Sequence, residues 1–103
     1  MKEKKDNPYK IDVVSIRLVK DAPIISAHPI QKPEDVVDLM GEYMCELDRE
    51  VLGVINLKTD GTPINCSFVS VGALDQTVAH PREILKTSIL SNAAKIMLIH
   101  NHP

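Results

Sequence analysis

The chain has 103 residues, of which 44% are hydrophobic and 25% are charged, and this composition predicts one small domain of ordinary soluble type. Its formal net charge of −2 gives no global basic field that would gather nucleic acid. The apolar runs are too short to span a bilayer, and no signal peptide follows the charged N-terminus. We therefore expect a cytoplasmic protein without membrane contact, a flexible basic tail over residues 1–9, and reduced thiols at Cys45 and Cys66.

The first predicted element after this tail is a strand over residues 10–20. The segment is rich in β-branched residues and alternates, so that Val14, Ile16 and Leu18 would share one face. Arg17 and Lys20 suit exposure to solvent, which favours a strand at the edge of a sheet. The next residues, 21–33, carry three prolines and indicate an extended connector with a short strand at residues 24–26.

A helix is predicted to begin at Pro33. Proline is tolerated in the first turn of a helix, and Glu34 and Asp35 in that turn complement the helix dipole. Gly41 interrupts the pattern moderately. The apolar residues at helical spacing form a face that we expect to be buried: Val36, Val37, Met40, Tyr43, Met44 and Leu47.

A β-hairpin is predicted to follow this helix. Residues 49–57 and 64–72 both resemble strands, and Asp60-Gly61 between them is the strongest short hairpin signal in the chain. The two strands would therefore pair in the antiparallel direction.

The remaining predicted elements are a loop, a helix and a strand. A loop over residues 72–79 leads into a helix over residues 81–94, with Pro81 in its first position and with Ile84, Leu85 and Ile89 on its buried side. The apolar run at residues 95–100 predicts a strand buried on both faces. This order predicts an α/β fold with a mixed sheet and flanking helices. If the last strand were parallel to a neighbour, the second helix would be its crossover.

The last six residues, "LIHNHP", resemble half of a metal site. On a strand, His100 and His102 would face one pocket with their Cα atoms about 7 Å apart, and Pro103 would end the strand. Two neutral imidazoles that converge are a credible start to a tetrahedral Zn²⁺ site. The alternative is that both are surface or structurally hydrogen-bonded histidines, because a single H-x-H motif is a weak signal.

Glu50 is the carboxylate that would complete this chemistry. It begins an apolar strand, and if it faces the same cleft it would be suited to take a proton from water. The alternative is a strand-end carboxylate beside Arg49. His28 and His80 each precede a proline and indicate turn or helix-entry positions rather than metal ligands.

Taken together, "DREVLGVINL", "VAHPREILK" and "SNAAKIMLIHNHP" resemble the RadC-type branch of the JAB/MPN (JAMM) metalloprotease superfamily, over residues 10–103. The resemblance implies a cytidine-deaminase-like (JAB/MPN) fold, incomplete here at its C-terminus. It also implies that His100 and His102 bind Zn²⁺ and that Glu50 is the catalytic general acid/base. The implied reaction is zinc-dependent hydrolysis of a peptide or isopeptide bond in a peptide or protein substrate.

The sequence departs from the family pattern after Pro103, because the S-x-x-D segment that would supply the third metal ligand has no counterpart. We therefore expect weak or absent zinc binding and negligible hydrolase activity from this chain. Asp75, Glu83 or Glu50 itself are left as candidate replacement ligands.

The alternative function is a non-catalytic interaction module. A sheet that ends after its last predicted strand would expose an unpaired edge, which favours a homo-oligomer. The family carries a historical DNA-repair label, and its short form resembles proteins of bacterial mobile elements. The net charge and the 3% aromatic content do not favour nucleic-acid binding here.

Overall fold

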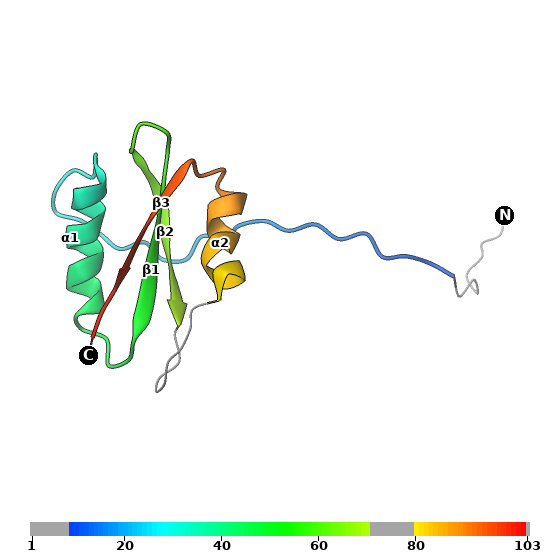
Figure 1. The fold of residues 1–103 in the computed structure, drawn as a ribbon, viewed down its shortest axis with the longest axis horizontal. Coiled ribbons are helices and arrows are strands. Elements are labelled where there is room, and N and C mark those ends of the chain that lie inside the picture. The colour runs from blue at the N-terminus through cyan, green and yellow to red at the C-terminus, as the bar shows by residue number, and fades with distance from the viewer. Residues whose placement is uncertain (1–8, 71–79, 103) are drawn as a thin grey trace.

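The computed structural model describes residues 9–70 and 80–102, and it folds them as a small α/β domain. In chain order the elements are α1 (Pro33–Met44), β1 (Val51–Leu57), β2 (Pro63–Ser70), α2 (Pro81–Leu90) and β3 (Lys95–His100). Figure 1 shows three layers, with α1 on one face of the sheet and α2 on the other. Neither described helix is long and apolar enough to cross a membrane.

The sheet has the strand order β2-β1-β3, and β1 is antiparallel to both of its neighbours. The prediction of a mixed sheet is therefore wrong for the described residues. Because β2 and β3 both oppose β1, they run in the same direction on either side of it. The chain between them contains α2, which joins two strands that are not neighbours. The crossover was expected only if β3 were parallel to a neighbouring strand, and its neighbour β1 is antiparallel to it.

The helix α1 begins as predicted at Pro33, because the local hydrogen bonds favour a start there. The Asp35 carboxylate accepts hydrogen bonds from the backbone N–H groups of Gln31 (2.9 Å) and Lys32 (3.0 Å). These bonds stabilise the charged form, so they lower the pKa of Asp35. They also satisfy donors that would otherwise be unpaired before the first turn.

The hydrophobic core lies between α1 and the sheet. The core cluster contains Val36, Met40 and Met44 of α1 and Val51, Ile55 and Leu57 of β1. Gly53 allows the close approach, since a Cβ atom there would lie 2.6 Å from the Cε atom of Met40. The predicted apolar face of the helix is therefore confirmed at its centre. Val37 and Leu47 are half-buried at its margin, while Tyr43 is exposed and its ring packs 5.1 Å from that of Phe68.

The predicted hairpin is confirmed in β1 and β2. Gly61 adopts a φ of 90°, which favours glycine, and the Asp60 carboxylate accepts a hydrogen bond from the N–H of Thr62 at 2.9 Å. The strands pair from Val51↔Ser70 onwards, with a register shift between Asn56 and Leu57. Residues 71–72, which were predicted to extend the second strand, lie outside the described residues, as do the loop to residue 79 and the tail up to residue 8.

The face of the sheet beneath α2 is mixed, because β1 places the buried Leu52 and Val54 there beside the fully buried Asn56. The prediction of an apolar buried side for α2 is wrong on this face. The buried side chain of α2 is Ser88, while Ile84 is only half-buried and Leu85 and Ile89 are exposed. The hydroxyl of Ser88 donates to Oδ1 of the fully buried Asn56 at 2.6 Å. The buried amide of Asn56 requires hydrogen-bond partners, so α2 turns Thr87 and Ser88 inward, which leaves Leu85 and Ile89 outside.

The prediction that β3 is buried on both faces is also wrong. Met97 and Ile99 are half-buried on the α1 side, whereas Ile96 and Leu98 are exposed on the α2 side. The cause is position, because within the described residues β3 pairs only with β1 and is an edge strand.

Residues 9–32 form neither helix nor strand, so the strands predicted at 10–20 and 24–26 are wrong for this structure. Figure 1 shows the first part of this segment projecting from the domain past α2. A strand needs a partner for its backbone groups, and no described strand lies beside residues 10–20.

Candidate metal centre

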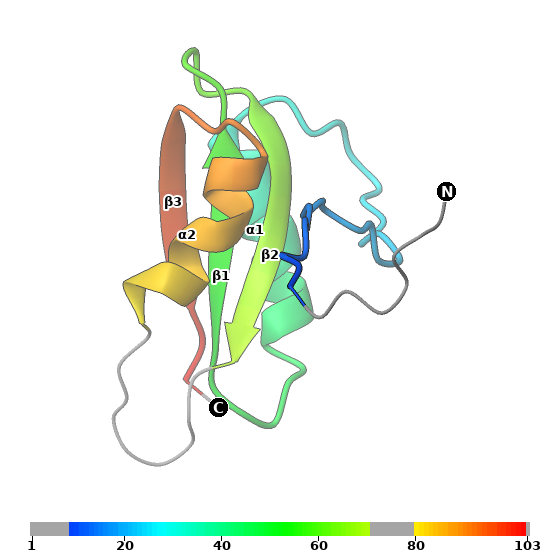
Figure 2. The same ribbon diagram turned by 90° about the vertical axis from the view of Figure 1, so that its right-hand side faces the viewer.

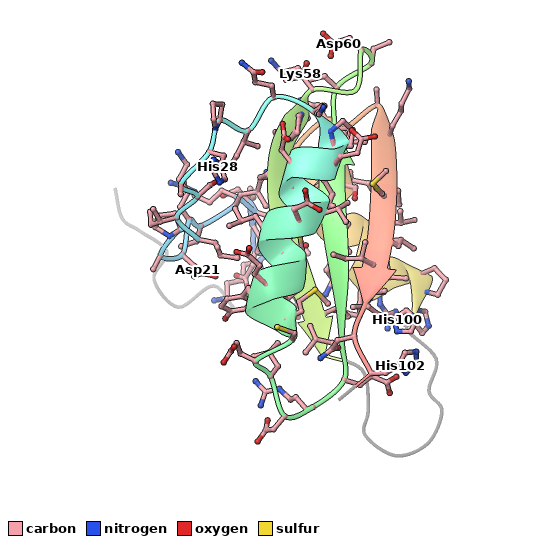
Figure 3. All side chains as sticks on the ribbon, turned by 90° about the vertical axis from the view of Figure 1, so that its left-hand side faces the viewer. Asp21, His28, Lys58, Asp60, His100 and His102 are labelled. Carbon is pink, nitrogen blue, oxygen red and sulfur yellow. The ribbon has the colours of Figure 1, made fainter. Side chains whose placement is uncertain are left out.

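The three predicted site residues converge where β1 begins and β3 ends. The register pairs Leu52 with His100, so Glu50, two residues before Leu52, lies opposite the residues that follow the end of β3. The metal-ligating atoms of Glu50, His100 and His102 all lie within 4.8 Å of one another. Figure 3 shows both histidines at the end of β3. Residues separated by fifty positions in the sequence therefore share one site.

This group is open to solvent. The Nδ1 atom of His102 lies 3.7 Å from Oε2 of Glu50, and their side chains are 78% and 37% exposed. The rings of His100 and His102 meet edge to face with centroids 4.6 Å apart. Glu50 is thus partly shielded rather than buried, and the imidazoles remain accessible to a ligand from solution.

Asn101, between the two histidines, holds the site together, and sequence reasoning missed it. Its Oδ1 atom accepts a hydrogen bond from the N–H of Val51 at 2.8 Å. Its Nδ2 group donates to the carbonyl oxygens of Met44 (3.1 Å) and Arg49 (3.0 Å). These bonds tie the end of β3 to both residues that flank Glu50. Strand alternation was the available signal, because a residue between two outward-facing histidines points the other way, into the domain.

The donor set suits a metal ion such as Zn²⁺. Two imidazoles and one carboxylate are ligands that zinc accepts in tetrahedral sites, and here their donor atoms already lie together. Glu50 can serve as the third ligand or as an acid/base group, but one carboxylate does not fill both roles independently. The geometry is therefore compatible with metal binding by side chains of this chain.

Of the other candidate ligands, Glu83 does not join this group. Glu83 lies on α2, where the ammonium of Lys86 at 3.1 Å lowers the pKa of that carboxyl, with Arg82 contributing less. Asp75 lies outside the described residues.

The two remaining histidines occupy the turn and helix-entry positions that were predicted for them. His80 caps α2, and its Nδ1 atom accepts a hydrogen bond from the N–H of Arg82 at 3.3 Å. The backbone N–H of His28 donates to Oγ of Ser26 at 3.1 Å, within a local turn.

A groove of about 430 Å³ lies beside the histidines, between α1 and the end of β3. Its α1 wall includes Val37 and Met44, and its β3 wall includes Ile99. Gly41 also lines the groove, and a Cβ atom at that position would meet nothing within 4 Å. The groove therefore offers a largely apolar surface that ends at His100 and His102.

Comparison with known proteins places this architecture in a family. The sequence model of the RadC-like JAB domain family matches residues 30–103. A UPF0758 protein of Desulfitobacterium hafniense is 42% identical over 74 residues, which cover 72% of this chain and 33% of that protein. Another UPF0758 protein, from Moorella thermoacetica, is 42% identical over 79 residues, which cover 77% of this chain and 34% of the relative.

A UPF0758 protein of Rubrobacter xylanophilus is 40% identical over 74 residues, which cover 72% of this chain and 33% of that relative. The chain spans about a third of the length of these relatives. No solved structure matches it significantly. The family match covers both helices, the hairpin and all three residues of the candidate metal centre. The chain belongs to the RadC-like JAB domain family.

Proposed function

We propose that this chain supplies the glutamate and the two histidines of a zinc hydrolase centre that acts on peptide or isopeptide bonds. The proposal rests on one observation, the convergence of Glu50, His100 and His102 within 4.8 Å in a domain of the RadC-like JAB family.

Each side chain has a distinct task in this proposal. His100 and His102 would hold the zinc ion, which when bound supplies positive charge that polarises a carbonyl group and lowers the pKa of water. Glu50 accepts a proton at its carboxylate and returns it to the leaving amine, a role that suits its partly shielded position. Asn101 keeps Glu50 beside the imidazoles through its bonds to Val51 and Arg49.

The groove between α1 and β3 gives the substrate a place. An extended peptide could lay apolar side chains against Val37, Met44 and Ile99, with its scissile bond directed at the histidines. The open surface at Gly41 leaves room for such a chain.

The number of metal-ligating groups in the described part of the chain sets the zinc affinity and activity that we expect of it. If Glu50 acts as the third ligand, it does not serve independently as the acid/base group, so we propose that the chain binds zinc weakly and hydrolyses little. Efficient hydrolysis requires a further ligand that releases Glu50 for proton transfer.

Zinc binding and hydrolysis are tested separately. Competition with a chromophoric chelator at pH 7 measures zinc affinity for the unaltered chain and for His100→Ala, His102→Ala and Glu50→Gln, with His28→Ala as the matched control. We expect both histidine variants at the site to lose binding at least tenfold and His28→Ala to retain it. Equal zinc affinity in all four variants would overturn the site.

Hydrolysis is measured on a fluorogenic peptide and on a lysine-linked isopeptide with zinc present. Rapid cleavage by the unaltered chain, abolished in His100→Ala, would overturn the proposed weak activity but retain the site. Cleavage that persists in Glu50→Gln would remove the proton-transfer role from Glu50.

A second candidate function is self-association without catalysis. The observation that favours it is the outer edge of β3, which pairs with no other strand among the described residues, beside exposed Ile96 and Leu98. Self-association alone does not distinguish the two functions, so the hydrolysis assay decides between them.

A further inference from the structure

Gly53, in the middle of β1, is surrounded by side chains from two other elements. Figure 2 shows β1 between β2 and β3, with α1 behind the sheet. A Cβ atom at position 53 would lie 2.6 Å from Cε of Met40, 3.1 Å from Cγ1 of Ile99 and 3.4 Å from Sδ of Met44. The first two distances are shorter than a favourable contact between carbon atoms. The space that Gly53 leaves free is therefore already filled by α1 and β3.

The side chains that fill this space have little room to yield. Met40 is fully buried and Met44 is 2% exposed, so neither can turn its end toward solvent. Ile99 is half-buried and packs against the same core cluster. An added methyl group at position 53 would therefore push the elements apart, because no single side chain can absorb it.

The glycine itself needs a local explanation. Glycine weakens the interior of a strand, and here it occurs in a strand whose residues are all buried. Its cross-strand partners are Phe68 of β2 and Ile99 of β3. None of the three atoms nearest to the missing Cβ belongs to Phe68. The close approach at Gly53 therefore concerns α1 and β3, not the hairpin.

The same two elements hold the candidate metal centre. The register pairs Gly53 with Ile99, which directly precedes His100 in the chain. The carbonyl oxygen of Met44, at the end of α1, accepts a hydrogen bond from Nδ2 of Asn101 at 3.1 Å. A shift of α1 or β3 away from Gly53 would lengthen this bond and displace the residues that follow Ile99.

We propose that Gly53 is a positioning residue of the metal centre. The absence of its side chain lets α1 and β3 approach β1 closely enough for Asn101 to bridge Met44 and Val51. Gly53 has no side chain that could bind a metal, and it acts through Ile99 and Asn101. Its effect on zinc affinity rests on the proposed function, whereas its effect on the hydrogen bonds of Asn101 does not.

Hydrogen exchange of the Val51 amide, followed by NMR, reports the position of Asn101 without zinc. This amide donates to Oδ1 of Asn101 at 2.8 Å. We expect Gly53→Ala to speed its exchange at least tenfold relative to the amide of Ile55 in the same strand. The ratio separates a local displacement from a general loss of stability, which would speed both amides equally. An unchanged ratio overturns the proposal, whether or not the chain binds zinc.

Zinc affinity and a rescue variant complete the test. Competition with a chromophoric chelator should show at least tenfold weaker binding in Gly53→Ala, as loss of groups that orient metal ligands does. Adding Met40→Leu should restore affinity to within about threefold of the unaltered chain, because leucine lacks the nearest atom, Cε. Met40→Leu alone is the matched control and should change neither the affinity nor the exchange ratio.

The outcomes separate this inference from the proposed function. Zinc affinity that stays low after Met40→Leu is added would overturn the positioning role, because the close contact would not be its cause. An unaltered chain that binds no zinc would contradict the proposed function, and the exchange of the Val51 amide would then decide the role of Gly53 alone.

Discussion

The two faces of the sheet differ in chemistry, because among the described residues only the α2 face contains a buried polar network. On the α1 side, Met40 and Met44 pack against Val51 and Ile55 in a continuous apolar cluster. On the α2 side, Asn56 of the central strand is fully buried and forms hydrogen bonds to the helix. The α1 face is therefore apolar, whereas the α2 face combines the buried Leu52 and Val54 with a satisfied polar network around Asn56.

The polar network is connected over two strands and α2. Nδ2 of Asn56 donates to Oδ1 of Asn65 at 2.6 Å and to the hydroxyl of Thr87 at 3.3 Å, and Thr87 lies 3.0 Å from the hydroxyl of Ser67. Within the described residues, no buried side-chain polar atom lacks a partner. Such a network fixes the position of a helix through directional bonds, whereas the apolar face supplies the larger free energy of burial. The α1 side therefore contributes most of the folding free energy, and the hydrogen bonds on the α2 side fix the position of α2.

The largest effect should come from breaking the apolar face. Met40 is fully buried, so Met40→Ala leaves a cavity and should lower the free energy of unfolding by about 2–5 kcal/mol. Ile89→Ala, on the exposed side of α2, is the control and should change it by less than about 0.5 kcal/mol. Urea unfolding followed by circular dichroism measures both. Similar losses in the two variants would mean that the described core is not where stability lies.

Breaking the polar network should cost less and should reveal coupling. Asn56→Ala leaves the hydroxyl of Ser88 without its acceptor and should lower the unfolding free energy by about 1–3 kcal/mol. The double variant with Ser88→Ala removes both partners, so its loss should fall short of the sum of the single losses by about 0.5 kcal/mol or more. Strict additivity in the same urea experiment would contradict the network.

The apolar face was predictable from the sequence, and the polar network was not. Helical spacing identified Val36, Met40 and Met44, because those residues alternate with charged ones around α1. In α2 the same reasoning chose Ile84, Leu85 and Ile89. It failed because the strand beneath carries Asn56, which no pattern within the helix can reveal. The strand predicted at residues 10–20 failed for a related reason, since a strand depends on a partner and periodicity does not supply one.

The sequence indicated which three residues form the candidate site, but it did not indicate the residue that holds them in place. His100 and His102 were identified by their spacing, and Glu50 by a carboxylate out of place before an apolar strand. Register brings these three together, and register between strands distant in sequence is a property of the fold. Asn101 was missed because its role appears only when its partners at Met44, Arg49 and Val51 are known.

Asn101 joins the end of β3 to the end of α1 and the start of β1, so its removal tests whether these elements position the site. Asn101→Ala should weaken zinc affinity by about 10- to 100-fold, because Glu50 loses the bonds that hold its neighbours. Asn101→Asp should not rescue it, since a carboxylate cannot donate to the carbonyl oxygens of Met44 and Arg49. Chelator competition measures affinity, and urea unfolding shows whether the fold persists. If Asn101→Asp kept the zinc affinity of the unaltered chain, the hydrogen bonds that Asn101 donates would not position the site.

The smallest effect concerns the reactivity of the two free thiols, which lie on the α1 side and differ in burial. Cys45 is exposed at the end of α1, while Cys66 is half-buried against the core cluster, and this burial raises the pKa of the Cys66 thiol. Only the thiolate reacts with iodoacetamide, so Cys45 should be alkylated faster between pH 7 and 9, as mass spectrometry of the labelled peptides would measure. Because the raised pKa favours the neutral thiol in the folded state, its contribution to stability is complete below the unfolded pKa of about 8.5 and declines as pH rises through the folded value. Met40→Ala should narrow the difference in rate by loosening the core around Cys66. A rate for Cys66 equal to that of Cys45 in the unaltered chain would contradict the depth assigned to the apolar face.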